Sequence, residues 1–265
     1  MRAALVSEYR KLISTRMWWL MLLVLAGYLA FIAGVMALSF AVAPEDAGLD
    51  LPPKEIATAV YGLINAIGYV FPLVIGSLAM TTEFRHQTIT QSLLAEPRRG
   101  VFLGAKLLAT IPLGLLYGVV GTIAVVGVSA PVLAGAGDGA FLTDGDVIAV
   151  ILLGILVTAL WAVIGAAFGS VLTNQVAAIV VILAFTQFVE PIARVAFTAF
   201  DSLAGVSKFL PGAAADGLMG ASFFGSFGGG STELLSRPVA LLVLLAYAGV
   251  LAAVGRYSTL RRDIG

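Results

Sequence analysis

Long apolar runs separated by short polar segments dominate the pattern of this chain. A helix that crosses the hydrocarbon core of a bilayer needs about 20 consecutive apolar residues. Six runs reach that length, and each is predicted to be a membrane-spanning helix. The pattern therefore predicts an all-α integral membrane protein with six transmembrane helices in one domain, residues 1–265. The runs cover Met17–Ala43, Ile56–Met80, Val101–Pro131, Val147–Leu172, Gln175–Phe197 and Val239–Gly255.

The leader, residues 1–16, forms a separate amphipathic segment before the first span. Such a helix is expected to lie in the membrane interface, followed by the aromatic pair Trp18 and Trp19. A solvated basic leader is one alternative. A cleaved signal peptide is another, but the apolar run far exceeds the ~7–15 residues of a signal peptide's apolar region. One arc of the helix holds Leu5, Val6, Tyr9, Leu12 and Ile13, and the other holds Ser7, Glu8, Arg10, Lys11 and Ser14.

The charged residues differ between alternate connecting segments. Lys and Arg outnumber Asp and Glu by 11 to 4 in the leader, between spans two and three (counting Lys106), and in the C-terminal tail. In the connections between spans one and two, three and four, and five and six, Asp and Glu outnumber Lys and Arg by 10 to 3. Because Lys and Arg mark the cytoplasmic side, both termini and the segment around Glu83 are predicted to be cytoplasmic. An odd number of spans would mix the two groups, so the asymmetry also supports six.

The longest connection covers residues 198–238. Its apolar residues recur at near-helical spacing, and we interpret them as one or two short amphipathic or re-entrant helices. Pro211 and Gly212 are expected to break the first apolar run, which starts at Phe200. The glycine-rich residues 225–232 are interpreted as a flexible connector. A loop with scattered apolar residues is the alternative.

One polar segment, residues 83–100, lies in the interior of the chain between two very apolar runs. It holds the only histidine, His86, and three arginines. Within it Ile89 and Leu93 are one helical turn apart and can stack. A helix over residues 83–97 is expected to end at Pro97, after which the chain returns to the bilayer. An ordinary positively charged loop is the alternative.

Composition limits the chemistry available to the chain. Hydrophobic residues make up 60% and charged residues 11% of its 265 residues, whereas soluble domains have about 25% charged residues. There is no cysteine, and a single histidine cannot build a histidine metal site. The net charge of zero gives no reason to expect nucleic acid as a partner. The sequence has no P-loop, Gly-x-Ser-x-Gly or His-Glu-x-x-His pattern, so we expect neither a bound cofactor nor catalysis by this chain alone.

Several fragments form a recognisable pattern: Glu83-Phe-Arg-His-Gln-Thr-Ile-Thr, Leu93-Leu94, Pro97-Arg-Arg, Ala105-Lys106-Leu, and, at the two ends, Glu8-Tyr-Arg-Lys-Leu and Arg261-Arg-Asp-Ile. This pattern resembles the permease subunits of type-2 ABC exporters. Their usual loop sequence is Glu, an aromatic residue, Arg, a short gap, Gly-Thr, a leucine-rich turn and Pro. Gln87 stands where that family commonly has Gly, which leaves the local turn geometry open.

The resemblance implies the transmembrane permease of an ATP-driven exporter in a bacterial plasma (inner) membrane. Its implied partners are a cytoplasmic ABC ATPase subunit, which would bind ATP and Mg, and a second permease. Residues 83–97 would be a coupling helix inserted into the ATPase, and residues 1–16 a connecting helix. Short re-entrant helices would precede the last span. The implied coupling residues are Glu83, Phe84, Arg85, His86, Thr88, Ile89, Leu93, Leu94, Pro97 and Arg98, and the connecting-helix residues are Leu5, Tyr9, Leu12 and Ile13.

Four of the polar residues inside the predicted spans are candidates for function, because charged groups there are costly and indicate function by default. Gln187, Glu190 and Arg194 occupy positions i, i+3 and i+7 of the fifth span, and Glu190 and Arg194 are spaced to pair. This pair is either structural, near the outer leaflet, or part of an export path or its gate. Asn65 in the second span is expected to bond another helix.

Two small-residue patterns indicate where the spans cross closely. They are Gly114-x-x-x-Gly118 and Gly165-x-x-x-Gly169, and without a Cβ each glycine lets a neighbouring backbone approach.

The sequence thus favours export of an amphipathic or hydrophobic compound, whose identity it does not reveal. One alternative is a non-transporting scaffold or sensor subunit in the membrane. The other is an intramembrane enzyme that uses Glu190, which would need catalytic partners from other spans.

Overall fold

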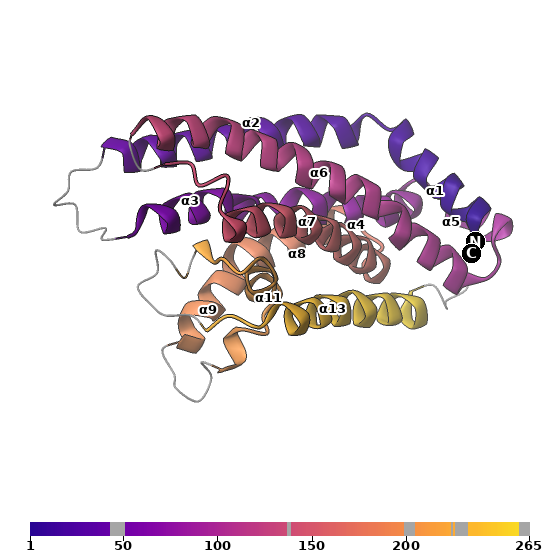
Figure 1. The fold of residues 1–265 in the computed structure, drawn as a ribbon. Helices are drawn as coiled ribbons and strands as arrows, with labels where there is room; N and C mark the ends of the chain where they lie inside the picture. The colour runs from indigo at the N-terminus through magenta and orange to yellow at the C-terminus, as the bar shows by residue number, and fades with distance from the viewer. Residues whose placement is uncertain (43–50, 137–138, 199–204, 224, 226–232, 260–265) are drawn as a thin grey trace.

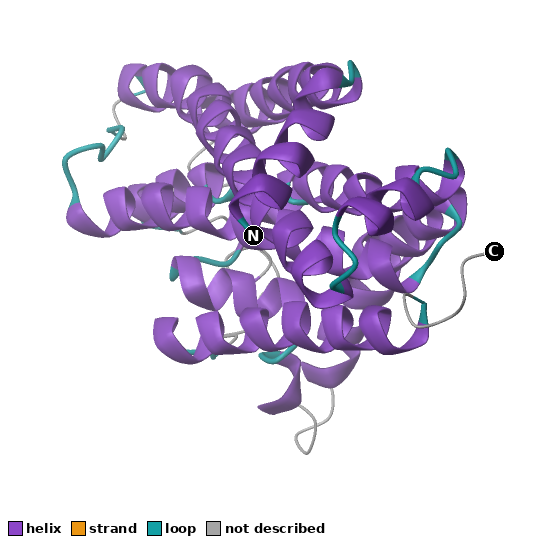
Figure 2. Cartoon of the chain, turned by 90° about the vertical axis from the view of Figure 1, so that its right-hand side faces the viewer, coloured by secondary structure: helices purple, strands orange, loops and turns teal. Residues whose placement is uncertain are grey.

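The computed structural model describes residues 1–42, 51–136, 139–198, 205–223, 225 and 233–259. Over these residues the chain is helical, with no strand (Figure 2). Six helical stretches are long and apolar enough to cross a membrane, which confirms the predicted number of spans and indicates a multi-pass membrane protein. They cover Met17–Val42, Pro53–Arg85, Arg99–Gly135, Gly145–Val171, Gln175–Phe197 and Arg237–Ser258.

The second and fifth stretches are composite, because each contains a π-helical turn. The second consists of α3 (Pro53–Tyr61), η1 (Ile64–Gly68) and α4 (Val70–Arg85), and the fifth of α8 (Gln175–Ala184), η2 (Phe185–Val189) and α9 (Glu190–Thr198). The other elements are α1 (Arg2–Ser14), α2 (Met17–Val42), α5 (Ile89–Ala95), α6 (Arg99–Gly135), α7 (Gly145–Val171), α11 (Pro211–Met219) and α13 (Arg237–Ser258).

The bundle has two distinct ends (Figure 1). The short helices α1 and α5 lie together at one end, which we call the α1 end. The opposite end, which we call the α11 end, carries α3, α9 and α11. Helix α6 begins near α5 and extends toward the α11 end, so it contacts elements of both ends.

Helix α7 is the centre of the packing, and glycines allow its close contacts. A Cβ on Gly165 would overlap the carbonyl oxygen of Leu73 in α4, and one on Gly169 would lie 2.5 Å from the Ser77 oxygen. A Cβ on Gly114 of α6 would lie 2.6 Å from Cα of Ala159 in α7. Both predicted small-residue patterns are therefore confirmed as sites of close helix crossing.

The second span is enclosed by the others. Within its most apolar window 83% of the residues are buried, compared with 22% in the fifth and sixth spans. The outer spans thus present broad apolar faces such as Phe31, Ile123 and Leu242, as expected of helices in contact with lipid or another membrane subunit.

The predicted break at Pro211 is confirmed, because residues 205–207 are helical, residues 208–210 are not, and a second helix, α11, begins at Pro211. Pro211 occupies the first helical position of α11, where the missing N–H is no loss and the fixed φ suits a helix. All nine residues of α11 are buried, and Leu218 and Met219 join the main hydrophobic core. Phe200 and most of the proposed connector, residues 226–232, lie outside the described residues, as does the C-terminal tail from residue 260.

We expect Gly165→Ala to destabilise the protein, because the added methyl group would push α4 away from α7. The expected loss is about 1–3 kcal/mol, the usual range for overpacking, measured as unfolding free energy in mixed detergent micelles. Gly127→Ala is the matched control, since a Cβ at Gly127 meets nothing within 4 Å. Equal stability of the two variants would contradict the close α4–α7 contact.

Candidate functional site

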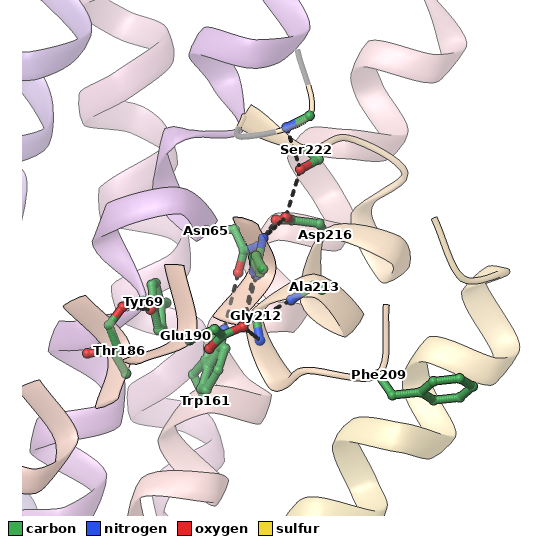
Figure 3. Close-up of polar contacts among 12 residues, drawn as sticks. Asn65, Tyr69, Trp161, Thr186, Glu190, Phe209, Gly212, Ala213, Asp216 and Ser222 are labelled. Atoms are coloured by element: carbon green, nitrogen blue, oxygen red, sulfur yellow. Dashed lines mark hydrogen bonds and ion pairs between the residues drawn. The ribbon is translucent and has the colours of Figure 1, made fainter. Parts of the chain in front are cut away.

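A polar cluster at the α11 end joins four elements that are far apart in the sequence (Figure 3). Asn65 comes from η1, Trp161 from α7, Glu190 and Arg194 from α9, and Asp216 from α11. Glu190 and Asp216 are almost fully buried, with 2% and 4% of their surface exposed. Charged groups at such depth need partners of opposite charge or hydrogen-bond donors.

Arg194 bridges the two carboxylates. Its Nη2 lies 3.0 Å from Oε1 of Glu190, one helical turn away, which confirms the predicted pairing. Its Nη1 lies 2.8 Å from Oδ2 of Asp216. The guanidinium therefore holds α9 against α11, an arrangement that its planar set of donors suits.

Glu190 also binds the N-terminus of α11. The backbone N–H groups of Gly212 and Ala213 donate to its Oε1 at 2.6 and 3.3 Å. A Cβ at position 212 would lie 2.6 Å from Oε1 of Glu190, so a side chain there would displace this carboxylate from the N-terminus of α11. The carboxylate thus accepts hydrogen bonds from two N–H groups that have no acceptor within α11. The other oxygen, Oε2, is buried and accepts no hydrogen bond from any described residue.

Asp216 accepts hydrogen bonds on both oxygens. Asn65 Nδ2 donates to Oδ1 at 2.6 Å, which confirms that Asn65 bonds another helix, and Ser222 Oγ donates to Oδ2 at 2.9 Å. Trp161 Nε1 in turn donates to Oδ1 of Asn65 at 3.2 Å. Burial raises the pKa of Asp216 above its ordinary value, and the Arg194 charge and these donors oppose that rise.

A cavity of about 180 Å³ adjoins this cluster. Both π-helical turns border it, η1 through Asn65 and η2 through Thr186 and Gln187. π-helical turns are rare and often mark functional sites. Gln187 is exposed, and its Nε2 lies 3.4 Å from Oγ1 of Thr186, so it borders the cavity without joining the Glu190–Asp216 cluster.

Sequence reasoning missed Asp216 and Trp161. Asp216 counted only as one of the acidic residues of a connecting segment, and Trp161 as part of an apolar run. The available signal was Asp216 itself, a lone acidic residue between Ala215 and Gly217 in an apolar stretch after a proline.

A second polar cluster, which we call the ion network, lies at the α1 end. Lys106 of α6 is 3% exposed, and its Nζ lies 2.5 Å from Oε2 of Glu8 and 2.7 Å from Oε1 of Glu83. The carbonyl oxygen of Ala79 accepts a third hydrogen bond from this ammonium at 3.0 Å. Three donated bonds satisfy the buried ammonium fully. Lys106 thus lies in helix α6 and is buried, whereas the sequence analysis counted it among the cations of the connection between spans two and three.

Lys11 extends the ion network to the surface. Its Nζ lies 2.6 Å from Oε1 of Glu8 and 3.0 Å from Oε1 of Glu83, and it donates to Oγ of Ser92 in α5 at 2.9 Å. Partial burial disfavours its charge, but the hydrogen bonds to Glu8 and Glu83 outweigh this and raise the pKa of Lys11. The ion network therefore joins α1, α4, α5 and α6.

Helix α1 forms as predicted, but the prediction for one of its faces was wrong. Glu8 was assigned to the exposed polar arc, yet it is 5% exposed because it reaches the ammonium of Lys106. Leu5 and Leu12 are half-buried against the bundle, whereas Tyr9 and Ile13 are 40% and 42% exposed.

The polar segment between the second and third spans is two helices, not the single helix predicted over residues 83–97. Helix α4 continues to Arg85, His86 ends it, and α5 begins at Ile89. Gln87 between them has a φ of 55°, in the left-handed region that favours glycine. Glu96 is extended before Pro97, as proline requires of the residue preceding it, so α5 ends there.

The ten residues assigned to coupling fall into two groups. In the first group Glu83 and Ile89 are buried, and Phe84, Thr88 and Leu93 are half-buried. The three apolar members of this group, Ile89, Phe84 and Leu93, belong to a small apolar cluster with Met80 and Phe102. The exposed group is Arg85, His86, Leu94, Pro97 and Arg98, among which Leu94 is a bare apolar side chain, 77% exposed.

Comparison with known proteins finds neither a protein family nor a curated relative that matches this chain. Among the described residues there is also no group of three or more acidic, histidine or cysteine side chains that could hold a metal ion.

We expect Lys106→Met to destabilise the protein by about 3–5 kcal/mol, because the buried Glu83 and Glu8 would lose their shared cation. The measurement is the unfolding free energy in mixed micelles. Lys54→Met is the control, since Lys54 pairs with Asp144 and Asp146 at the surface and its loss should have little effect. Similar losses in both variants would show that the ion network contributes no more than a surface pair.

We expect Gln87→Gly to preserve or raise stability and Gln87→Val to lower it by about 1–2 kcal/mol. A β-branched residue is disfavoured at positive φ, whereas glycine is not. Thermal unfolding of both variants beside the wild type tests this. If valine were as well tolerated as glycine, the turn at residue 87 would not require a left-handed conformation.

Proposed function

We propose that this chain is the membrane-spanning permease subunit of an ATP-driven exporter in a bacterial plasma membrane. It would move an amphipathic or hydrophobic compound out of the cytoplasm, together with a second permease and a cytoplasmic ABC ATPase that binds ATP and Mg. The observation that carries the proposal is the ion network, which ties the two short helices of the α1 end directly to two spans.

Such a link is what mechanical coupling requires. A force on α5 would pass to α1 through the Ser92–Lys11 hydrogen bond and to α4 and α6 through Glu83 and Lys106. Ile89, packed against Phe102 of α6, supports the same path. Because packed helices shift between discrete arrangements rather than deform continuously, motion at α5 would move the spans as units.

The surface of α5 suits a protein partner. Leu94 projects from it as an isolated apolar group, and Arg85 and His86 are exposed beside the turn that precedes it. An exposed apolar side chain surrounded by polar groups is a typical anchor of an interface. We therefore assign docking on the ATPase to Leu94 and its exposed neighbours, and transmission to the buried Glu83 and Ile89.

Two further observations support the proposal. Exposed basic residues gather at the α1 end. Asp144 and Asp146 lie at the start of α7, and Glu233 lies shortly before α13, at the other end, which favours a cytoplasmic α1 end. In addition, Gln87 stands where the family that this chain resembles commonly has glycine, and its φ of 55° lies in the left-handed region that favours glycine.

The test is co-purification of this chain with ABC ATPases encoded near its gene, followed by ATPase assays in proteoliposomes. We expect Leu94→Glu to weaken association about tenfold or more, as loss of an interface anchor does, without changing thermal stability. Leu142→Glu is the matched control, because Leu142 is also exposed, at 44%, but lies between α6 and α7.

Failure to recover any ATPase under several mild detergents would contradict the exporter and favour a non-transporting scaffold or sensor. If an ATPase bound equally well to the Leu94→Glu and Leu142→Glu variants, the assignment of docking to α5 would be wrong.

A further inference from the structure

The cluster at the α11 end holds more acid than base. Glu190, Asp216 and Arg194 would carry one net negative charge if all three were ionised. Of these, Glu190 is 2% exposed and Asp216 is 4% exposed. An uncompensated charge at that depth is strongly unfavourable, and carboxyl groups commonly avoid it by binding a proton. The charges balance if the two carboxyl groups share one proton.

The hydrogen bonds show which oxygen takes the proton. Both oxygens of Asp216 accept from donors, namely Asn65, Ser222 and Arg194. On Glu190, Oε1 accepts from Arg194 and from the two backbone N–H groups at the start of α11, whereas Oε2 meets no donor among the described residues. An ionised carboxylate shares its charge between both oxygens, and the share on Oε2 would be buried without a donor, so protonation at Oε2 removes the costliest part of the arrangement.

We propose that this cluster is a proton-binding site, in which Glu190 carries one exchangeable proton on Oε2 at neutral pH while Asp216 remains ionised against Arg194. The guanidinium then neutralises Asp216 and still donates to Oε1 of Glu190. When the proton leaves to solvent, Oε2 becomes a buried anion without a donor, and the cluster gains one negative charge.

The other titratable groups near Glu190 leave this balance unchanged. Tyr69, between η1 and α4, donates its hydroxyl proton to the carbonyl oxygen of Thr186 at 3.1 Å. Tyr247 of α13 donates to the carbonyl oxygen of Phe209 at 3.1 Å. Both phenols are therefore neutral donors engaged elsewhere. Trp161 of α7 does not titrate, which leaves Arg194 and Asp216 as the charged groups that face Glu190 among the described residues.

The cavity provides a route for exchange. Glu190 lines it together with polar groups of Thr186, Gln187 and Asn65. A space of about 180 Å³ has room for several water molecules. Water bridging these polar side chains could carry a proton between Oε2 and the exposed Gln187 after small side-chain movements.

This inference does not depend on the proposed export function, because it concerns protonation of the resting protein without an ATPase. It distinguishes Glu190 from a simple structural ion pair, in which both carboxylates would be ionised.

The test is infrared spectroscopy of the full chain in lipid bilayers at neutral pH. Surface carboxylates are ionised there, so a protonated carboxyl gives its own carbonyl band, which shifts in deuterated water. We expect this band in the wild type, its loss in Glu190→Gln and its retention in Glu55→Gln. Glu55 is an exposed carboxylate that serves as the matched control.

Stability measurements supply a second, independent readout at the same pH. Glu190→Gln mimics the protonated form and should retain wild-type thermal stability, whereas Asp216→Asn removes the ionised partner of Arg194 and should lower it clearly. Absence of a protonated carboxyl band in the wild type overturns the proposal, whatever the variants do. So does persistence of that band in Glu190→Gln.

Discussion

Close backbone contact around α7 is the constraint on which the rest of the structure depends. Because lipid tails are as apolar as the side chains they would replace, association of spans relies on tight packing rather than on the hydrophobic effect. Gly165 lets α4 approach α7, Gly114 brings in α6, and Gly255 allows α13 to meet α7 at Ser170. These crossings enclose the second span and thereby hold Asn65 at one end and Glu83 at the other inside the protein.

The two polar clusters solve the same physical problem in different ways. The ion network pairs Glu8 and Glu83 with Lys11 and Lys106, so its charges cancel and Lys106 has all three donors used. The cluster at the α11 end sets two carboxyl groups against one guanidinium and uses the N-terminus of α11 as an additional positive pole. The ion network is therefore an electrically neutral contact between helices, whereas the cluster at the α11 end has capacity for a further positive charge.

Sequence patterns predicted the local features well. Hydropathy located all six spans to within a few residues, because the ability of a segment to span a membrane depends on its local composition. Helical spacing alone predicted the Glu190–Arg194 pair. The partners in contacts between distant segments could not be predicted. The Glu8–Lys106 contact joins residues 98 positions apart, and the Asn65–Asp216 bond joins residues 151 apart. The break at Pro211 could be predicted, because proline cannot continue a preceding helix and is well suited to the first position of the next one.

The position of Lys106 has a consequence for biosynthesis. A lone ammonium is costly to bury inside a protein, and one that is hydrogen-bonded to carboxylates is less costly. Both carboxylates that bind it, those of Glu8 and Glu83, precede it in the sequence and so emerge from the ribosome earlier. The first two spans and α1 can therefore be in place as a receptor when α6 arrives. The order of synthesis itself would then guide assembly of the membrane domain, with the N-terminal helix acting as an intramolecular chaperone for the third span.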